Sequence, residues 1–142
     1  MQKSKYPYPE LTQLKRSQTI YPENPQEAVL ETFENRFPDR GYQVTFCCPE
    51  FTARCPVTGQ PDFGDITIIY FPLKRCIDSK SLKLYLYSYR NHNTFHEDSV
   101  NQILDDVVKY ACPREATVIG KFRPRGGISI TVTAAYKEPG MD

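Results

Sequence analysis

A cysteine and an aspartate seven residues apart form the most chemically suggestive pair in the sequence. Cys55 and Asp62 lie in the segment FTARCPVTGQPDFG at 51–64, which two prolines and Gly59 punctuate. A thiolate adds readily to an electrophilic carbon, and a nearby carboxylate can take and return the proton that this addition moves. Because proline and glycine define the backbone of a turn, we expect a stiff loop that holds the two groups at a fixed separation. The structural alternative is a small buried thiol beside an ordinary turn aspartate. For an isolated cysteine–aspartate pair, this interpretation is favoured over a catalytic one.

The histidines of the chain offer two other uses for these groups. A hydrolase could combine Cys55, His96 and Asp62, but nothing in the sequence supplies the oxyanion hole that acyl transfer needs. A zinc site could combine Cys55 or Cys48 with His92 or His96. Its spacings match no familiar ligand set, which makes the zinc site a weak alternative.

Two local basic groups stand out in the sequence. Lys80 and Lys83 form one, and the run RPRGG at 123–127 forms the other. On a helix, Lys80 and Lys83 would lie at i and i+3, on the same side. Such charges are usually a solvated surface; the alternative is a clamp for phosphate groups, to which glycine backbone adds N–H donors. No GxGxxG follows a predicted strand, which excludes a Rossmann dinucleotide fold.

Glu97 has a structural interpretation of its own. Thr94, with Glu97 three residues later, has the form of a capping box at the start of a helix. A binding role would require the carboxylate to face a cleft and to accept hydrogen bonds from N–H groups of a ligand. The pattern alone favours the capping role.

Length and composition place the chain among ordinary single-domain globular proteins. It has 142 residues, 39% of them hydrophobic and 25% charged, and a net charge of +1. The near-neutral charge gives no case for a nucleic-acid or membrane partner. No apolar run approaches the roughly 18 residues of a membrane span, and the chain opens without the apolar stretch of a signal peptide, so we expect a cytoplasmic protein. Five cysteines without CxxC spacing argue against a disulfide framework and against a zinc knuckle.

The chain divides into an arm and one domain. Residues 1–25 are rich in Tyr and Pro and lack periodicity, which predicts an extended N-terminal arm. Residues 26–142 are expected to form a single domain, whose first part at 26–37 could be a helix or a strand. Alternation predicts strands over 42–48 and 65–71, so the thiol-bearing loop connects two strands.

Two helices are predicted next. The segment SKSLKLYLYSYRN at 79–91 fits a strand or a helix face, and its lack of β-branched residues favours a helix capped by Ser79 or Ser81. Residues 95–111 carry apolar side chains at i, i+3, i+4 and i+7, which predicts an amphipathic helix.

Two more strands complete the pattern. They are predicted over 116–122 and 128–136, joined across the run at 123–127. The order is strand, strand, helix, helix, strand, strand. That order indicates an α+β fold of antiparallel hairpins with the helices on one face of the sheet.

Four separate segments, in order, resemble one family of enzymes. They are CPEFTARCPVTGQPDFG at 48–64, DSKSLKLY at 78–85, SYRNHNTFHED at 88–98 and KFRPRGGISI at 121–130. In that order, the four segments resemble the catalytic loop, the signature segment, the substrate-binding turn and a late hairpin of the QueF family of nitrile reductases. The family converts 7-cyano-7-deazaguanine to 7-aminomethyl-7-deazaguanine in queuosine biosynthesis. The resemblance covers about residues 40–130, and Asp78 opens the signature where the family pattern has Glu.

The resemblance implies a fold and an assembly. The fold is the tunnelling fold (T-fold), a four-stranded antiparallel sheet with two helices on one face, whose subunits join into a barrel. A chain of one such unit resembles the short form of the family. That form is implied to be a homodecamer of two stacked pentameric rings, with active sites between neighbouring subunits.

The resemblance also implies a mechanism and a role for each candidate residue. The nitrile is reduced through a thioimide on the cysteine, with two NADPH per turnover and no metal requirement. Direct binding of nucleic acid or membrane is not implied. The implied roles are nucleophile for Cys55, acid/base for Asp62, substrate binding for Glu97 and His96, and NADPH phosphate binding for Lys80, Lys83 and, more weakly, Arg125.

Two other functions fit parts of the pattern. A zinc-dependent cyclohydrolase of the same fold would need bound zinc and would open the ring of GTP. An RNA-binding module could use RPRGG and the tyrosines, although the near-neutral charge argues against it.

Overall fold

The computed structural model describes residues 20–140 of the chain. Most of the predicted arm therefore lies outside the described residues, and the predicted boundary between arm and domain stays a prediction. The elements are, in chain order, β1 (Thr32–Glu34), β2 (Val44–Arg54), β3 (Pro61–Phe71), β4 (Arg75–Ile77), α2 (Ser79–Tyr87), α3 (His96–Ala111), β5 (Glu115–Arg125) and β6 (Ile128–Lys137).

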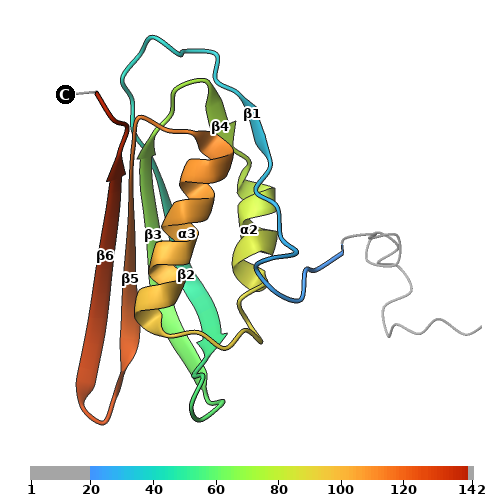
Figure 1. Ribbon diagram of the computed structural model, residues 1–142, viewed down its shortest axis with the longest axis vertical. Helices are drawn as coiled ribbons and strands as arrows, with labels where there is room; N and C mark the ends of the chain where they lie inside the picture. Colours follow the sequence, from blue (N-terminus) through green and yellow to red (C-terminus); the bar gives the residue numbers. More distant parts are fainter. Residues whose placement is uncertain (1–19, 141–142) are drawn as a thin grey trace, which may run out of the picture.

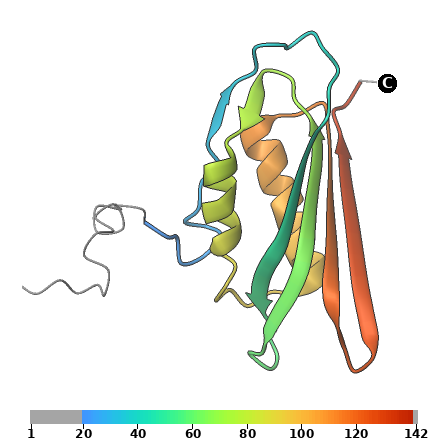
Figure 2. The same ribbon diagram turned by 180° about the vertical axis from the view of Figure 1, so that it is seen from behind.

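One antiparallel sheet is the centre of the fold. Its strands lie in the order β2-β3-β5-β6, and each neighbouring pair is antiparallel. Helix α3 packs on β5 and β6, and α2 lies beside it and contacts β2, so both helices cover the same face (Figure 1). The view from behind shows the strands in front of α3 (Figure 2). The predicted α+β arrangement of two hairpins with helices on one face is confirmed.

Alternating strand residues and one helix stripe fill the core. In β3, Ile66, Ile68 and Tyr70 point toward the helices and are buried. Burying such a side chain fully stabilises the fold by roughly 1.5–3 kcal/mol. The predicted apolar stripe of α3 packs against them, and its buried members are Val100, Ile103, Leu104, Val107 and Ala111. The core therefore holds α3, and with it the first turn of the helix, in place over the sheet.

The thiol-bearing segment is mostly strand, which corrects the prediction of a loop over 51–64. Strand β2 continues through Arg54, and β3 begins at Pro61. The ladder can extend this far because Pro61 takes the first position of its strand, where the missing N–H is tolerated. Only residues 55–60 connect the strands. The carboxylate of Asp62 is thus carried by a strand, and the thiol by the turn.

The late hairpin is also longer than predicted. Strand β5 runs to Arg125, so residues 123–125 belong to the strand and not to the connection. The turn consists of Gly126 and Gly127, with φ of 56° and 78°. Two central residues with positive φ form the tight turn whose twist matches antiparallel strands, and glycine adopts this conformation without strain.

Helix α2 is confirmed, but its N-cap is Asp78 and not Ser79 or Ser81. The Asp78 carboxylate accepts a hydrogen bond from the Ser81 N–H at 3.1 Å. The Ser81 hydroxyl instead accepts from the Glu31 N–H at 2.7 Å, which ties α2 to the segment before β1. Aspartate is among the favoured N-cap residues. The position at which the chain departs from the family pattern therefore has a structural role.

The predicted capping box at the start of α3 is wrong. The helix begins at His96, its N-cap is Phe95, and no side chain caps it. Thr94 lies outside the helix because its N–H donates to the Arg54 carbonyl at 2.9 Å and its hydroxyl donates to the Phe95 carbonyl at 3.2 Å. Glu97 is therefore exposed in the first turn, with a carboxylate that does not cap the helix.

A second sheet of two strands was not predicted. Strand β1 pairs with β4 in antiparallel register. Within the segment 26–37, whose class the sequence left open, only residues 32–34 are strand. A strand of three residues is too short to show a two-residue period, so only its distant partner reveals it.

Candidate active site

Cys55 begins the turn that joins β2 to β3. Its N–H donates to the Gln60 carbonyl at 2.9 Å, and its carbonyl accepts from the Gly59 N–H at 2.8 Å. Gly59 has a φ of 71°, which glycine adopts without strain. These bonds fix the backbone on both sides of the half-buried thiol.

The pKa of the Cys55 thiol is lowered from its ordinary value. The main cause is the Thr58 hydroxyl, which donates to the sulfur, and the backbone N–H groups of Thr58 and Val57 add to it. Desolvation and the Asp62 carboxylate act in the opposite direction, but the donors prevail. Hydrogen bonds to a thiolate stabilise the nucleophilic form of cysteine. Because the Asp62 charge influences the thiol, the structure brings the predicted nucleophile and acid together.

The variant Thr58→Val keeps the shape of the side chain and removes its hydroxyl. We expect the pKa of the Cys55 thiol to rise, because the thiolate loses its principal donor. A higher pKa means less thiolate at neutral pH, so alkylation of Cys55 by iodoacetamide at pH 7 should slow and its pH profile should move upward. Peptide mass spectrometry follows Cys55 separately from the other cysteines. Thr58→Ser retains the hydroxyl and should keep the wild-type profile; an unchanged profile in Thr58→Val would contradict the role of this residue.

Asp62 is buried on β3 and is paired with one cation. Its side chain is 8% exposed, and its Oδ1 lies 2.9 Å from Nη2 of Arg125. The same nitrogen donates to the Pro61 carbonyl at 2.6 Å. The sequence offered Arg125 as a ligand of phosphate, whereas its guanidinium group contacts the predicted acid.

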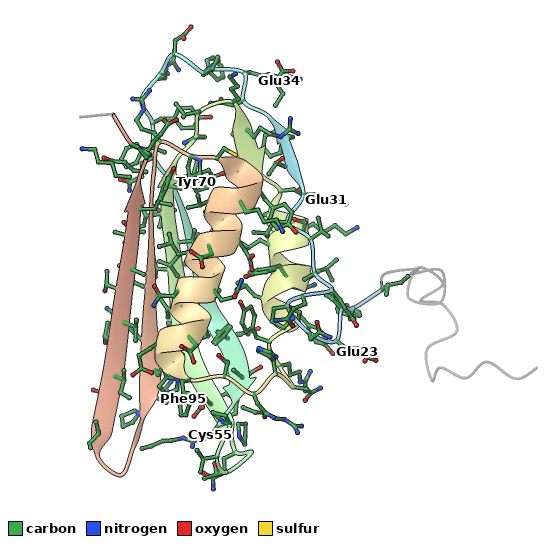
Figure 3. All side chains as sticks on the ribbon, in the orientation of Figure 1. Glu23, Glu31, Glu34, Cys55, Tyr70 and Phe95 are labelled. Carbon is green, nitrogen blue, oxygen red and sulfur yellow. The ribbon has the colours of Figure 1, made fainter. Side chains whose placement is uncertain are left out.

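The residues before α3 tie the start of that helix to the end of β2. The Arg54 N–H donates to the His92 carbonyl at 3.0 Å, and the Arg54 carbonyl accepts from the Thr94 N–H at 2.9 Å. Because Arg54 directly precedes Cys55, this bridge brings the first turn of α3 next to the thiol-bearing turn. Figure 3 shows Cys55 and Phe95 at the same end of the sheet.

The first turn of α3 carries an imidazole and a free carboxylate. The His96 ring stacks on Phe122 with 3.8 Å between centroids and 12° between planes. Phe122 lies opposite Gly64, two residues along β3 from Asp62, so the stack places His96 over the strand of the acid. A Cβ at Gly64 would come within 2.8 Å of the Phe122 ring, so glycine makes room for it. Within the described part of the chain, the Glu97 carboxylate has no hydrogen-bond partner and can accept from a ligand.

A cleft of about 770 Å³ opens between β2 and α2, beside the thiol-bearing turn. Its volume lies within the range of small-molecule sites. The lining is mostly apolar and includes three cationic side chains, from Arg54, Lys83 and Arg90. Lys80 does not share this cleft; it lines a separate, smaller hollow beside Asp78. The two predicted lysines are therefore close in sequence but face different spaces.

Sequence reasoning missed three residues of this region. Thr58 lies three residues after Cys55 in a tight turn, and a hydroxyl at that distance is the signal that could have found it. Arg54 and Arg90 had no such signal, because they line one cleft only when the segment after α2 lies beside β2.

Between residues 20 and 140, no group of three or more His, Cys, Asp and Glu side chains could hold a metal ion. The zinc set considered from Cys55 or Cys48 with His92 or His96 is therefore not assembled in this part of the chain. No helix there is long and apolar enough to cross a membrane.

The arrangement can support nucleophilic addition with proton transfer. Cys55 carries a thiol with a lowered pKa, and Asp62 is a nearby carboxylate held by a guanidinium group. Glu97 and His96 can contact a polar heterocycle at the same end of the sheet. A thiolate, an acid and a recognition carboxylate together suit addition to an electrophilic carbon of a nitrogen-rich ring system.

Comparisons with known proteins agree with this arrangement. A family model described as QueF-like protein matches residues 61–141. Two relatives are NADPH-dependent 7-cyano-7-deazaguanine reductases from Bacillus cytotoxicus and Bacillus mycoides. Each is 56% identical over 112 residues, which cover 79% of this chain and 68% of the relative. The crystal structure of the archaeosine synthase QueF-Like in the apo form is similar with a TM-score of 0.59, at 20% identity, over 66% of this chain and 90% of that one. At that identity the likeness shows the fold alone, and it supports the predicted fold class.

Proposed function

The chain belongs to the QueF family, and from that premise we propose that it is an NADPH-dependent 7-cyano-7-deazaguanine reductase of queuosine biosynthesis. It reduces the nitrile group of this substrate to an aminomethyl group, a four-electron reduction. The observation that carries the proposal is the Cys55 thiol, whose pKa is lowered by donors of its own turn, beside the buried carboxylate of Asp62.

Cys55 and Asp62 carry out the first step. A nitrile carbon is electrophilic but resists direct hydride attack, so covalent activation is useful. The S–H bond of Cys55 breaks, its proton passes to Asp62, and the sulfur bonds to the nitrile carbon. Asp62 then returns the proton to the nitrile nitrogen. The product is a thioimide that retains every atom of the substrate and of the thiol.

The thioimide is then reduced in two stages, for which bound NADPH supplies the hydrides. After the first hydride and a proton have been added, the tetrahedral adduct on Cys55 collapses, the C–S bond breaks, and an imine is left. Cys55 departs as a thiolate, which the donors of its turn stabilise. The N–H proton that this collapse releases passes to Asp62, and the imine takes up that proton and a second hydride to become the amine.

Glu97 and His96 bind the substrate in this proposal. An ionised carboxylate only accepts hydrogen bonds, and the pyrimidine part of the deazaguanine offers several N–H donors. The exposed Glu97 carboxylate is available for them. The stack on Phe122 limits the orientation of the His96 ring, which lies beside the bound heterocycle.

The cleft between β2 and α2 suits the cofactor. Phosphate groups pair with guanidinium and ammonium groups, and Arg54, Lys83 and Arg90 bring three of them to one lining. The apolar side chains of the lining suit the rings of a dinucleotide, and the Glu50 carboxylate lies in the same lining. Lys80 lines the separate hollow beside Asp78, so in this proposal it binds a different phosphate group of the cofactor from Lys83.

The variant Lys83→Met removes one cation of this cleft and keeps an unbranched side chain of similar length. We expect the KM for NADPH to rise by about tenfold, since loss of a charged hydrogen bond costs roughly 1.5–3 kcal/mol. The kcat should stay near the wild-type value, and Cys55 should still form its adduct without cofactor. Lys74→Met, another exposed lysine outside the cleft, is the control. An unchanged KM in Lys83→Met would place the phosphates elsewhere.

We further propose a ring-shaped assembly, with a homodecamer of two pentamers as the predicted stoichiometry. In residues 20–140, the outer edges of β2 and β6 have no strand partner. Long unpaired edges favour pairing with another chain. Because the four strands alternate in direction, β6 of one subunit can pair with β2 of the next in antiparallel register. Native mass spectrometry measures the stoichiometry, and a monomer at micromolar concentration would contradict the proposal.

The direct test of the function is to mix the protein with 7-cyano-7-deazaguanine and NADPH and to follow the absorbance of the reduced cofactor. We expect two NADPH to be oxidised per substrate, since a nitrile needs two hydrides to become an amine. Incubation with GTP and added zinc tests the cyclohydrolase alternative. Ring opening of GTP without oxidation of NADPH would reject the reductase assignment.

A further inference from the structure

We infer that Arg125 is a positioning residue for the acid Asp62 and does not bind the cofactor. The inference rests on the proposed function, because it assigns a task within the same addition to the nitrile. Three observations lead to it: the contacts of one guanidinium nitrogen, the place of Arg125 in the sheet, and the contrast with a neighbouring ion pair.

One nitrogen of Arg125 contacts two consecutive residues of β3. Nη2 lies 2.9 Å from Oδ1 of Asp62 and 2.6 Å from the carbonyl oxygen of Pro61. A terminal guanidinium nitrogen carries two hydrogens, so it can donate one to each acceptor. The carboxylate is thereby held in a fixed orientation relative to its own backbone.

Both partners belong to paired strands. Arg125 pairs with Ile128 across the glycine turn, and Asp62 pairs with Ala53 of β2, two residues before Cys55. The backbone of the acid is thus held by β2, while its side chain is held by the end of β5. Because both its backbone and its side chain are held, the Asp62 carboxylate keeps a fixed position relative to the thiol, as proton transfer between the two requires.

The contact leaves one oxygen of Asp62 available. Oδ1 is engaged by Arg125, whereas Oδ2 has no hydrogen-bond partner among the residues that the structure describes. The guanidinium group contacts Oδ1, and the Cys55 thiol is close enough for the Asp62 charge to act on its pKa. Oδ2 is therefore the atom that takes the thiol proton and returns it to the nitrile nitrogen.

Cofactor binding at Arg125 would conflict with this contact. A phosphate group that drew the guanidinium group away would leave a carboxylate that is only 8% exposed without its cation. A buried charge that loses its partner is strongly destabilised. Arg125 is also absent from the lining of the cleft that holds Arg54, Lys83 and Arg90.

A second ion pair between the same two strands provides a matched control. Nη1 of Arg123 lies 3.1 Å from Oδ2 of Asp65, and the two side chains are 56% and 40% exposed. Exposed pairs of this kind contribute little, since solvent screens them. The variants Arg125→Met and Arg123→Met therefore remove the same type of contact, one at the buried acid and one in solvent.

The experiment measures adduct formation in the absence of NADPH, so that cofactor binding cannot influence it. Each protein is mixed with 7-cyano-7-deazaguanine, and the growth of the covalent adduct is followed by intact mass. We expect the rate constant to fall by about 10- to 100-fold in Arg125→Met, as for loss of a charged hydrogen bond, and to be unchanged in Arg123→Met. Arg125→Lys, which keeps the charge, should recover part of the rate. In the Asp62→Asn background, Arg125→Met should add no further loss, because its effect passes through Asp62.

The outcomes separate the possibilities. A normal adduct rate in Arg125→Met with a raised KM for NADPH would overturn the inference and return Arg125 to the cofactor site. A further loss in the Asp62→Asn background would also overturn it. If Arg125→Met does not fold, the same comparison made with Arg125→Lys decides. If wild-type protein forms no adduct, the proposed function itself fails, whatever the variants do.

Discussion

Replacement of Cys55 by alanine is expected to abolish oxidation of NADPH in the presence of 7-cyano-7-deazaguanine. Removal of a catalytic nucleophile costs about six orders of magnitude in a serine protease, and the proposed thioimide forms on the Cys55 sulfur. The protein should still bind the substrate without a covalent bond, because Glu97 and His96 are unchanged. Absorbance at the wavelength of reduced cofactor measures the first effect, and calorimetry with substrate alone measures the second.

The chain supplies a control for the loss of a thiol. Cys112 is exposed at the end of α3, and its sulfur donates to the Lys109 carbonyl at 3.7 Å. The variant Cys112→Ser removes a sulfur atom far from the turn and keeps a donor. We expect its turnover to equal that of wild type. Turnover by Cys55→Ala at more than a trace would show that reduction proceeds without the proposed nucleophile.

The variant Glu97→Gln should lower kcat/KM for the substrate by about one to two orders of magnitude. The reason is that glutamine keeps one acceptor but turns an N–H donor toward the N–H groups of the heterocycle, and a hydrogen bond to a charged group contributes roughly 1.5–3 kcal/mol. When an acceptor of the substrate-binding site is replaced, an N–H group of the bound substrate is left without its partner, and transition-state binding weakens strongly. Steady-state kinetics at saturating NADPH measures the effect.

A variant at Asp98 distinguishes a loss of substrate recognition from a loss of helix stability. Both Glu97 and Asp98 lie in the first turn of α3, where a negative charge interacts favourably with the helix dipole by roughly 0.3–1 kcal/mol. Asp98→Asn should therefore lower the unfolding temperature about as much as Glu97→Gln does, with little change in kcat/KM. Equal losses of kcat/KM in both variants would assign Glu97 a structural role only.

The long elements of the fold could be predicted from the sequence because their periods are unambiguous. The stripe from Val100 to Ala111 has helical spacing over three turns, and its members are buried except for Val108, which is half-buried. Alternation over 65–71 likewise predicts the inner part of β3. The spacing of apolar residues shows which side of a helix or strand faces the core, and this spacing can be read within the element itself.

The ends of the same elements could not be predicted, because partners distant in sequence decide them. Pro61 and Gly59 read as a loop, yet the opposing strand extends the ladder as far as Pro61. Thr94 has the form of a cap, but the Arg54 carbonyl takes its N–H and holds it outside the helix. Local preference is overridden wherever a tertiary hydrogen bond competes with it.

The candidate site shows the same division. Resemblance pointed to Cys55 and Asp62 because their motif is continuous in sequence. Thr58 and Arg125 act through contacts between side chains: the Thr58 hydroxyl group hydrogen-bonds the sulfur within the turn, and Arg125 at the end of β5 contacts the acid. The spacing in the turn could have suggested Thr58, whereas the contact of Arg125 with the acid becomes visible only with the geometry.

The intact mass of wild-type protein incubated with 7-cyano-7-deazaguanine, without NADPH, tests the account most directly. Thioimide formation adds the whole substrate to Cys55 and loses nothing, so the mass should rise by that of one substrate molecule per chain. The added mass should map to the peptide that contains Cys55 and disappear once NADPH is supplied. An unmodified mass, or an adduct on another cysteine, would contradict the assignment of Cys55 as the nucleophile of a nitrile reductase.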